Sequence, residues 1–219
     1  MKMNYEAVLF DMDGVLINSE ELMTKTGILT LRDYGIAATP EDFVPFVGRG
    51  EDLYIGGVAE KYGVPYKTEM KHRCYEYFGQ YVETDAKVPP EIPDLLYQLK
   101  DFGYKTCVCT SADWEKVVHN LRAMKVGKEA FDCIITGDDI KNKKPDPEIY
   151  LKGAAALHVI PEKCVVVEDA PNGILAAHTA DMLSIAIDTS FPERVLISES
   201  HPDFVIHRLS EILAILEDT

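Results

Sequence analysis

The hydrophobic positions of this chain change their spacing along its length. Ala7 to Phe10 form a continuous apolar run, which predicts a short strand buried on both faces. Between positions 18 and 87 the apolar residues recur at helical spacing, and no convincing strand interrupts them. After position 88, apolar runs alternate with helical patterns. The sequence thus predicts a strand, then an all-helical block, then an alternating region.

The helical block has recognisable starts and stops. Asn18, with Glu21 three residues later, forms a capping-box pattern, and Gly35 can end the first helix. Pro40 marks a second start, because proline is favoured in the first turn of a helix. Two more helices are predicted over 51–62 and 68–78.

The alternating region begins after Val88-Pro89-Pro90, where the prolines end the helical block. Strands are predicted over 105–109, 131–135, 164–167, 183–187 and 204–206, and helices over 91–102, 113–125, after Pro147, 172–180 and 209–216. Such alternation is typical of a parallel sheet covered by helices on both faces. We therefore predict an α/β fold, a Rossmann-like doubly wound parallel sheet formed by 1–17 and 88–219, with an α-helical cap domain at 18–87 inserted after the first strand.

Composition narrows the class of partner and the compartment. The chain has 219 residues and a net charge of −15, which argues against nucleic acid or an anionic membrane surface as partner. No apolar run approaches the roughly 18 residues of a membrane span, and the first residues lack the apolar core of a secretory signal. We expect a cytoplasmic monomer. The cysteines are odd in number and include no C-x-x-C pair, so we expect structural thiols in a reducing compartment: Cys74, Cys107, Cys109, Cys133 and Cys164.

Polar side chains follow three of the predicted strands directly. The first strand ends in Asp11-Met12-Asp13, the strand at 105–109 in Thr110-Ser111, and the strand at 164–167 in Glu168-Asp169. In an open parallel sheet, ligands bind beyond the carboxyl ends of the strands. Oxygen donors without nitrogen or sulfur favour magnesium, which takes one or two carboxylates and keeps positions for water and phosphate oxygens. Lys144, just before a predicted helix, could add a cation.

Each of these residues also has an ordinary structural interpretation. Asp13 could be a turn or capping residue, and Thr110-Ser111 could cap the next helix. Lys144 lies in a lysine-rich loop that would normally be solvated. An EF-hand calcium loop is excluded, because its required glycine and glutamate positions hold Leu16 and Leu22.

Taken together, four segments identify a family resemblance. FDMDGVL, CTSA, KKPDPEIY and VVVEDAPNG occur in this order, and the match that they define covers essentially the whole core from 5 to 188. The chain resembles the haloacid dehalogenase superfamily of phosphotransferases, in the branch that contains β-phosphoglucomutase and small sugar-phosphate phosphatases. The helical block resembles the cap of that branch only loosely.

The resemblance implies a role for each matched residue. Asp11 would be the nucleophile that accepts the phosphoryl group, and Asp13 the general acid and base. Thr110 would hydrogen-bond the transferring group, helped by the backbone N–H groups of Ser111 and Ala112. Lys144 would neutralise charge between the nucleophile and the phosphate.

The same resemblance implies a magnesium site and a cap contact. Asp11, Glu168, Asp169 and the Asp13 carbonyl would hold the ion. Arg49, near a cap loop that in relatives reaches over the active site, would contact substrate, although a surface arginine beside Glu51 and Asp52 is an equal interpretation.

The predicted function is that of a magnesium-dependent phosphatase of small phosphomonoesters, sugar phosphates in particular, with a small phosphorylated metabolite as its partner. A phosphoglucomutase-like isomerase is the alternative, which Met23 weakens because the mutase usually has a histidine there. A phospho-accepting regulatory module is a third interpretation, but it leaves the helical block at 18–87 unexplained.

Overall fold

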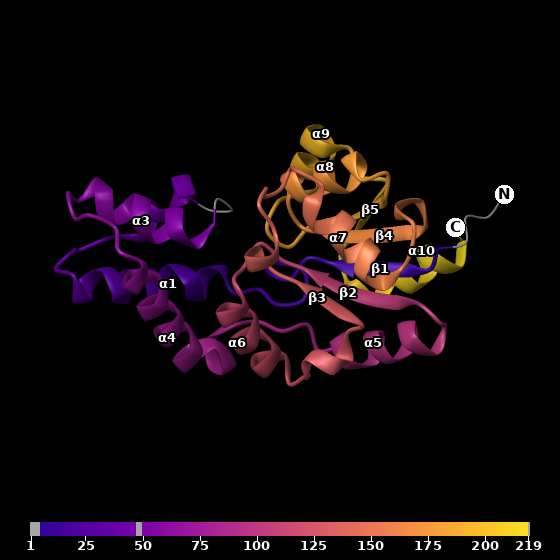
Figure 1. The fold of residues 1–219 in the computed structure, drawn as a ribbon, viewed down its shortest axis with the longest axis horizontal. Coiled ribbons are helices and arrows are strands. Elements are labelled where there is room, and N and C mark those ends of the chain that lie inside the picture. The colour runs from indigo at the N-terminus through magenta and orange to yellow at the C-terminus, as the bar shows by residue number, and fades with distance from the viewer. Residues whose placement is uncertain (1–4, 47–49, 219) are drawn as a thin grey trace.

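A computed structural model describes residues 5–46 and 50–218. The six strands of these residues form one entirely parallel sheet in the order β3-β2-β1-β4-β5-β6. Figure 1 shows the sheet in the right half of the molecule. The bounds are β1 Ala7–Phe10, β2 Lys105–Cys109, β3 Cys133–Ile135, β4 Cys164–Glu168, β5 Leu183–Ile187 and β6 Phe204–Ile206. The predicted α/β fold with a parallel sheet is confirmed.

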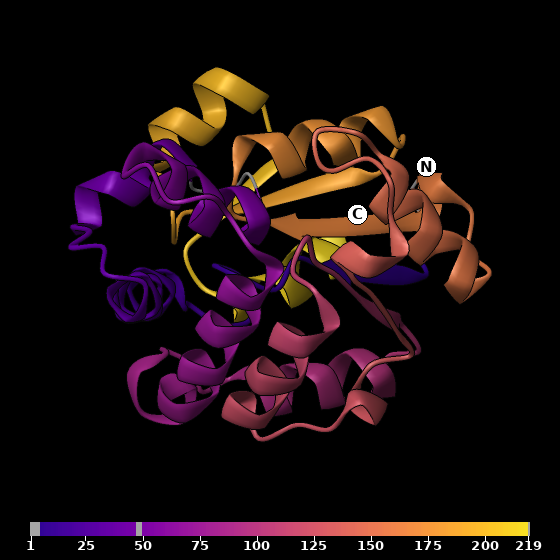
Figure 2. The ribbon, with the colours of Figure 1, turned by 60° about the vertical axis from the view of Figure 1, so that its left-hand side comes forward.

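Helices cover both faces of the sheet, as Figure 2 shows. Alternate strand residues point to opposite faces: Val8 and Phe10 belong to one hydrophobic cluster, and Ala7 and Leu9 to another. The first face packs against α5 (Ile92–Asp101), α6 (Trp114–Met124) and α10 (Ile212–Asp218), and the second against α7 (Glu148–Leu157) and α8 (Pro171–Thr179). Because both faces are covered, the strands read as continuous apolar runs in the sequence.

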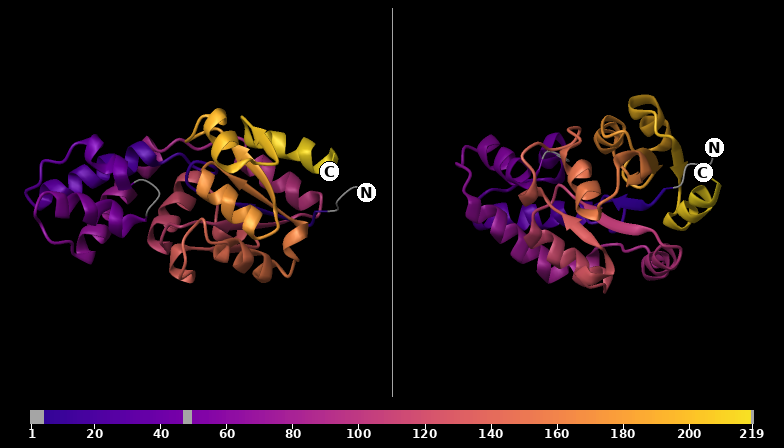
Figure 3. Two further views of the ribbon diagram at one scale, coloured as in Figure 1. Left: turned by 90° about the horizontal axis from the view of Figure 1, so that it is seen from above. Right: turned by 45° about the vertical axis from the view of Figure 1, so that its right-hand side comes forward.

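Of the helices between β1 and β2 in the sequence, the four that precede α5 extend beyond the carboxyl ends of the strands (Figures 1 and 3). They are α1 (Glu20–Asp33), α2 (Pro40–Phe43), α3 (Glu51–Lys61) and α4 (Thr68–Asp85). The chain enters and leaves this helical group at one place, where Asn18 and Lys87 form an antiparallel bridge with N···O distances of 2.8 and 3.0 Å. The division into 1–17 with 88–219 and 18–87 remains a prediction, and this bridge joins the two predicted boundary positions.

The helix starts differ from the sequence prediction in one informative place. The N-cap of α1 is Ser19, not Asn18, so the predicted capping box is wrong. Asn18 instead uses its backbone for the bridge to Lys87, and the Ser19 hydroxyl donates to Asp13 rather than to the helix. The backbone pairing of Asn18 with Lys87 and the hydrogen bond from Ser19 to Asp13 therefore outweigh the local capping preference of Asn18.

Two other elements depart from the prediction. Helix α4 continues to Asp85, well beyond position 78, and α9 (Glu193–Ser200) was not predicted. Helix α9 buries only Leu196 and Ser200, so its sequence carries little amphipathic signal.

All five cysteines are free thiols in the described part of the chain, and four of them are buried. Neither α1 nor any other helix within residues 5–46 and 50–218 has the length and apolar character that crossing a bilayer would require.

Candidate active site

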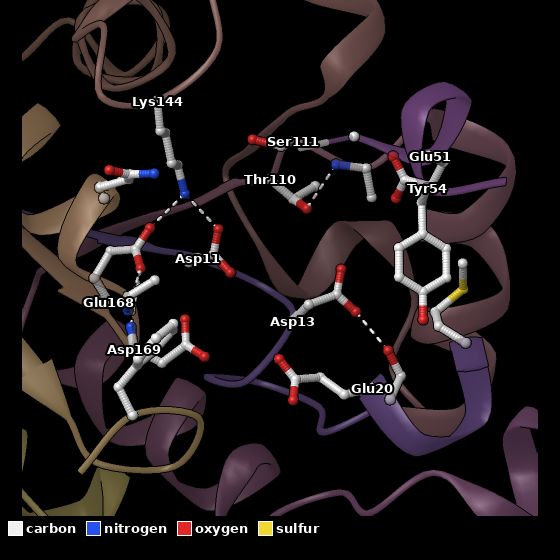
Figure 4. Close-up of a pocket in the computed structure, with 18 of the residues that line it drawn as sticks. Asp11, Asp13, Glu20, Glu51, Tyr54, Thr110, Ser111, Lys144, Glu168 and Asp169 are labelled. Atoms are coloured by element: carbon white, nitrogen blue, oxygen red, sulfur yellow. Dashed lines mark hydrogen bonds and ion pairs between the residues drawn. The ribbon is translucent and has the colours of Figure 1, made fainter. Parts of the chain in front are cut away.

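The polar strand ends meet in one cavity of about 520 Å³ (Figure 4). Its floor is formed by residues that directly follow β1, β2 and β4, and its opposite wall by residues of α1 and α3. Because the sheet is parallel, its three central strands deliver their last residues to the same edge. The structure thus brings together side chains separated by more than 150 positions in the sequence.

Lys144 reaches this cavity from the loop before α7 and binds two carboxylates. Its ammonium group contacts Asp11 and lies 2.5 Å from Glu168 Oε1, and its side chain is only 10% exposed. A further hydrogen bond runs to the carbonyl of Cys109 at 3.2 Å. Lys144 is therefore a buried ion-pair partner, and its interpretation as a solvated loop lysine is excluded.

Burial and charge shift the pKa of both partners. Burial raises the pKa of Asp11 to about 7, while the Lys144 charge acts in the opposite direction. Burial alone would lower the pKa of Lys144, but the Asp11 and Glu168 carboxylates raise it above its ordinary value. The lysine thus keeps its positive charge next to Asp11.

Both oxygens of Glu168 have protein partners. Oε1 accepts from Lys144 and from the Tyr150 hydroxyl at 2.8 Å, and Oε2 accepts from the backbone N–H groups of Asp169 and Ala170 at 2.9 and 3.1 Å. Since these four bonds use most of the acceptor capacity of a carboxylate, Glu168 fits a residue that positions Lys144 better than the direct metal ligand predicted from the sequence.

Asp169 lies against the backbone of Gly14, where no β-carbon is present. A β-carbon built on Gly14 would lie 1.7 Å from Asp169 Oδ2, so only glycine leaves room for this carboxylate. Burial, together with the charges of Glu168 and Asp11, raises the pKa of Asp169 well above its usual value. A cation beside Asp11 and Asp169 would relieve this concentration of negative charge.

The donor set fits magnesium. Among residues 5–46 and 50–218, no three His, Cys, Asp or Glu side chains form a metal-binding group. A magnesium site can use fewer than the three carboxylates predicted from the sequence, because the ion is commonly held by one or two carboxylates while waters and substrate oxygens fill the other positions. Asp11 and Asp169 are 8% and 5% exposed and supply such carboxylates.

Asp13 is surrounded by hydrogen-bond donors. Ser19 donates to Asp13 Oδ1 at 2.6 Å, the Lys116 ammonium lies 2.8 Å from Oδ2, and the amide of Asn120 is 3.5 Å from Oδ1. Its side chain bonds these groups and not a helix N-terminus, so the capping interpretation is wrong, although its backbone does lie directly before the turn at 14–16. The carboxylate is held by groups from α6 and from the start of α1.

Thr110 and the residues after it border the same cavity. Thr110 is 1% exposed, and its hydroxyl accepts a hydrogen bond from the Ala112 N–H at 3.1 Å. The N-cap of α6 is Asp113, so Thr110 and Ser111 do not cap that helix. The Ala112 N–H predicted to bind phosphate is thus engaged with Thr110 in this structure.

The wall opposite the strand ends includes Met23 and Thr24 of α1 and Glu51 and Tyr54 of α3. Arg49, predicted as a substrate contact, lies outside the described residues. The sequence reasoning missed Lys116 and Glu51, whose charged groups are 3.8 Å apart between α6 and α3. Lys116 lies one turn into a predicted helix. The helical repeat shows which residues share a face with Lys116, but the direction of its side chain also requires the orientation of that helix relative to the sheet, which the sequence does not give.

Two curated relatives are similar over most of this chain. The phosphorylated carbohydrates phosphatase of Thermotoga maritima is 35% identical over 187 residues, which cover 80% of this chain and 81% of that protein. Protein SUPPRESSOR OF QUENCHING 1, chloroplastic, of Arabidopsis thaliana is 40% identical over 194 residues, or 87% of this chain. The match spans only 18% of the length of the Arabidopsis protein.

A solved structure shows the same fold. CbbY from Rhodobacter sphaeroides, in complex with phosphate, superposes with a TM-score of 0.83 at 26% identity, covering 97% of this chain and 99% of that one. Residues 8–187 match the family of haloacid dehalogenase-like hydrolases, and this span contains Asp11 and Asp169 on the strand ends and Lys144 in the loop before α7. The chain is therefore an enzyme of the haloacid dehalogenase-like hydrolase family.

Proposed function

We propose that this enzyme is a magnesium-dependent phosphatase of small phosphomonoesters, sugar phosphates in particular. The observation that carries the proposal is the buried arrangement of Asp11, Lys144 and Asp169 at the end of the central strands. A phosphate ester and a carboxylate nucleophile are both anions, so their approach requires cations in a site from which water is largely excluded. The Thermotoga relative, named as a phosphatase of phosphorylated carbohydrates, supports the substrate class.

In the proposed first step, an Asp11 carboxylate oxygen attacks phosphorus and the bond to the leaving oxygen breaks. The product is an aspartyl phosphate, with the alcohol released after it takes a proton from Asp13. Lys144 would offset the charge that accumulates between Asp11 and the phosphoryl oxygens, and Thr110 would hydrogen-bond one of them. Bound magnesium would neutralise and orient the same phosphoryl group.

In the second step, Asp13 takes a proton from water as the water oxygen attacks phosphorus. Asp11 is regenerated and inorganic phosphate leaves. The donors around Asp13 suit this role, because Ser19 and Lys116 hold its carboxylate in one orientation between turnovers.

Hydrolysis is better supported than the mutase alternative. A mutase must retain a bisphosphate intermediate and return the phosphoryl group to it. Met23, where the mutase usually has a histidine, lines the cavity as an apolar side chain. This position therefore offers the leaving group no proton-transferring side chain.

Asp11→Asn tests the proposal, with activity measured on an aryl phosphate and on a sugar phosphate at saturating magnesium. We expect turnover of both esters to fall at least about a thousandfold, because the amide cannot form the phosphoenzyme. Asp101→Asn, the same change in an exposed residue at the end of α5, is the control and should keep full activity. Turnover by Asp11→Asn within tenfold of the parent enzyme would refute the nucleophile and the phosphatase assignment with it.

A further inference from the structure

Three cysteines gather on one face of the sheet, on β2 and β3. Cys107 and Cys109 belong to the buried cluster beneath α7, and their sulfur atoms are 3.7 Å apart. Cys133, the first residue of β3, packs against the same cluster. None of these three described residues lines the catalytic cavity. They therefore form a separate group of nucleophilic side chains, which the reaction proposed above does not use.

The register of the sheet sets Cys107 opposite Cys133. Opposed residues of neighbouring strands point to the same face, and such strands lie about 4.8 Å apart, within the roughly 4.4 to 6.8 Å that separates the Cα atoms of a disulfide. Cys107 and Cys109 are two residues apart on one strand, which gives a Cα separation of about 6.6 Å, near the limit of that range. The pair that can be bridged with the least movement is therefore Cys107 with Cys133.

The two thiols differ in access and in acidity. Cys133 is partly exposed, whereas Cys107 is 0% exposed. Interaction with the Cys107 thiol lowers the pKa of Cys133, while contacts with Cys109 and Cys133, together with burial, raise the pKa of Cys107. Since the thiolate is the form that reacts with oxidants, Cys133 is suited to react first and Cys107 to follow as the protonated partner.

The cysteine cluster touches the backbone that holds the catalytic lysine. The carbonyl of Cys109 accepts a hydrogen bond from Lys144 at 3.2 Å, and Thr110 follows directly. The segment 136–147, which carries Lys144, begins where β3 ends. Gly153 of α7 lies against the thiols, because a β-carbon there would be 2.8 Å from the sulfur of Cys109 and 3.4 Å from that of Cys107. The thiols thus have little room to rearrange, and a bridge between β2 and β3 would shift the surroundings of Lys144.

We propose that Cys107 and Cys133 are a modification site, at which a hydroperoxide forms a disulfide that a dithiol reductant reverses, and that this bridge slows the enzyme. The inference goes beyond the proposed phosphatase reaction, and only its effect on turnover rests on that reaction. It gives a role to two of the cysteines that the sequence predicted to be structural.

The proposed oxidation has two steps. The Cys133 thiolate attacks the hydroperoxide, the O–O bond breaks, and the sulfur takes the hydroxyl as a sulfenic acid while the leaving oxygen takes a proton from water. The Cys107 sulfur then attacks the sulfenic sulfur, the S–S bond forms, and the hydroxyl leaves as water with the Cys107 proton. Two thiols are thus oxidised by two electrons, and the peroxide is reduced.

Thiol counting on the whole enzyme tests the site. The reduced enzyme, with magnesium present, is treated with a few equivalents of hydrogen peroxide, and its free thiols are counted after denaturation in an alkylating reagent. We expect the count to fall from five to three, with one linked peptide that joins Cys107 to Cys133. Turnover of an aryl phosphate should fall at least about threefold and recover after dithiothreitol, because a displacement of about 1 Å near Lys144 is enough to slow phosphoryl transfer.

Variants of single cysteines identify the reacting pair. Cys133→Ser should keep its four remaining thiols and its turnover under the same treatment. Cys107→Ala should stop at the sulfenic acid on Cys133, which dimedone traps, because the second sulfur is missing. Cys74→Ser is the matched control, since it makes the same change in a buried thiol of α4 that bonds Thr26. It should lose two thiols and slow as the parent enzyme does.

Five free thiols in the treated parent enzyme, or the same thiol loss in Cys133→Ser, would overturn the modification site. A bridge between Cys107 and Cys133 that leaves turnover unchanged would overturn its link to Lys144. Failure of the reduced enzyme to hydrolyse an aryl phosphate would instead contradict the phosphatase assignment, because the thiol counts need no substrate. The failures of the two proposals are therefore distinguishable.

Discussion

Gly14 has a φ angle of +85°, and the Asp169 carboxylate occupies the space that a side chain at this position would need. We predict that Gly14→Ala lowers the apparent affinity for magnesium by about tenfold or more, because Asp169 must move away from Asp11. The left-handed backbone should also cost about 1 kcal/mol of stability. Activity titrated against magnesium, together with thermal unfolding, measures the two effects separately.

Gly35→Ala separates backbone strain from the loss of space. Gly35 has a similar φ of +77°, but a β-carbon there would meet no atom within 4 Å. This variant should lose a similar amount of stability and keep the magnesium dependence of the parent enzyme. Identical magnesium titrations for the two variants would contradict the role given to Gly14.

At the scale of single residues, the sequence was sufficient to place a site residue wherever that residue directly follows the end of a strand. Asp11, Thr110 and Asp169 needed only the alternation of apolar runs and helices to be placed together. Ser19 and Lys116 could not be placed in this way, because the direction of their side chains depends on how α1 and α6 pack. Asn18 shows a different kind of error: its local sequence predicts a helix cap, but its backbone pairs with Lys87 instead.

At the scale of elements, α4 packs against α6 through a close contact at Gly79. A β-carbon on Gly79 would lie 2.4 Å from Cε1 of His119. Nearby, Arg122 of α6 donates to the Gly79 carbonyl and pairs with Glu83 at 2.6 Å. This contact ties the inserted helices to the helix that carries Lys116.

Gly79→Ala tests that packing. In a free helix, alanine would be favoured over glycine by about 0.5 to 1 kcal/mol. Here we expect a lower melting temperature instead, because the new methyl group collides with His119 and separates α4 from α6. A double-mutant cycle with His119→Ala should give a coupling energy of about 1 kcal/mol or more, since removing the ring makes room for the methyl group. An increase in melting temperature with Gly79→Ala alone would refute this contact.

Strands that appear in the sequence as continuous apolar runs were predicted well. The bounds of β2 and β5 agree with the predicted strands. Helix α9 was missed because it lies at the edge of the molecule and buries few side chains. The end of α4 was placed too early because its last turns contain charged and polar residues, which stay helical through packing against α6 rather than through their own pattern.

At the scale of the whole molecule, we predict that the buried carboxylates make the stability of the fold depend on pH and on added magnesium. Burial raises the pKa of Asp11 from 3.8 to about 7, so between these values the folded state binds a proton that the unfolded state has lost. This contribution to stability is complete below about pH 4 and is lost as the pH rises through 7. The metal-free enzyme should therefore lose stability between pH 5 and pH 8.

Thermal unfolding at pH 5.5 and pH 8, with and without magnesium, measures this effect. We expect the melting temperature of the metal-free parent enzyme to be lower at pH 8 than at pH 5.5 by at least about 3 °C more than that of Asp11→Asn, which serves as the reference for the other titrating groups. Magnesium should restore most of the loss, because it binds the ionised carboxylates of the folded state. If Asp11→Asn shows the same pH dependence as the parent enzyme, another group is responsible.

The bridge between Asn18 and Lys87 has a consequence for how such an enzyme can change over time. The chain leaves the core and returns to it at neighbouring points. The length of the segment between these points therefore adds little to the entropy cost of closing the connection between β1 and β2. A different segment with the same closely spaced ends could be grafted there without altering the strands that carry the chemistry. New substrate preferences can then be acquired by replacement of one contiguous stretch of gene, while the reaction itself is inherited unchanged.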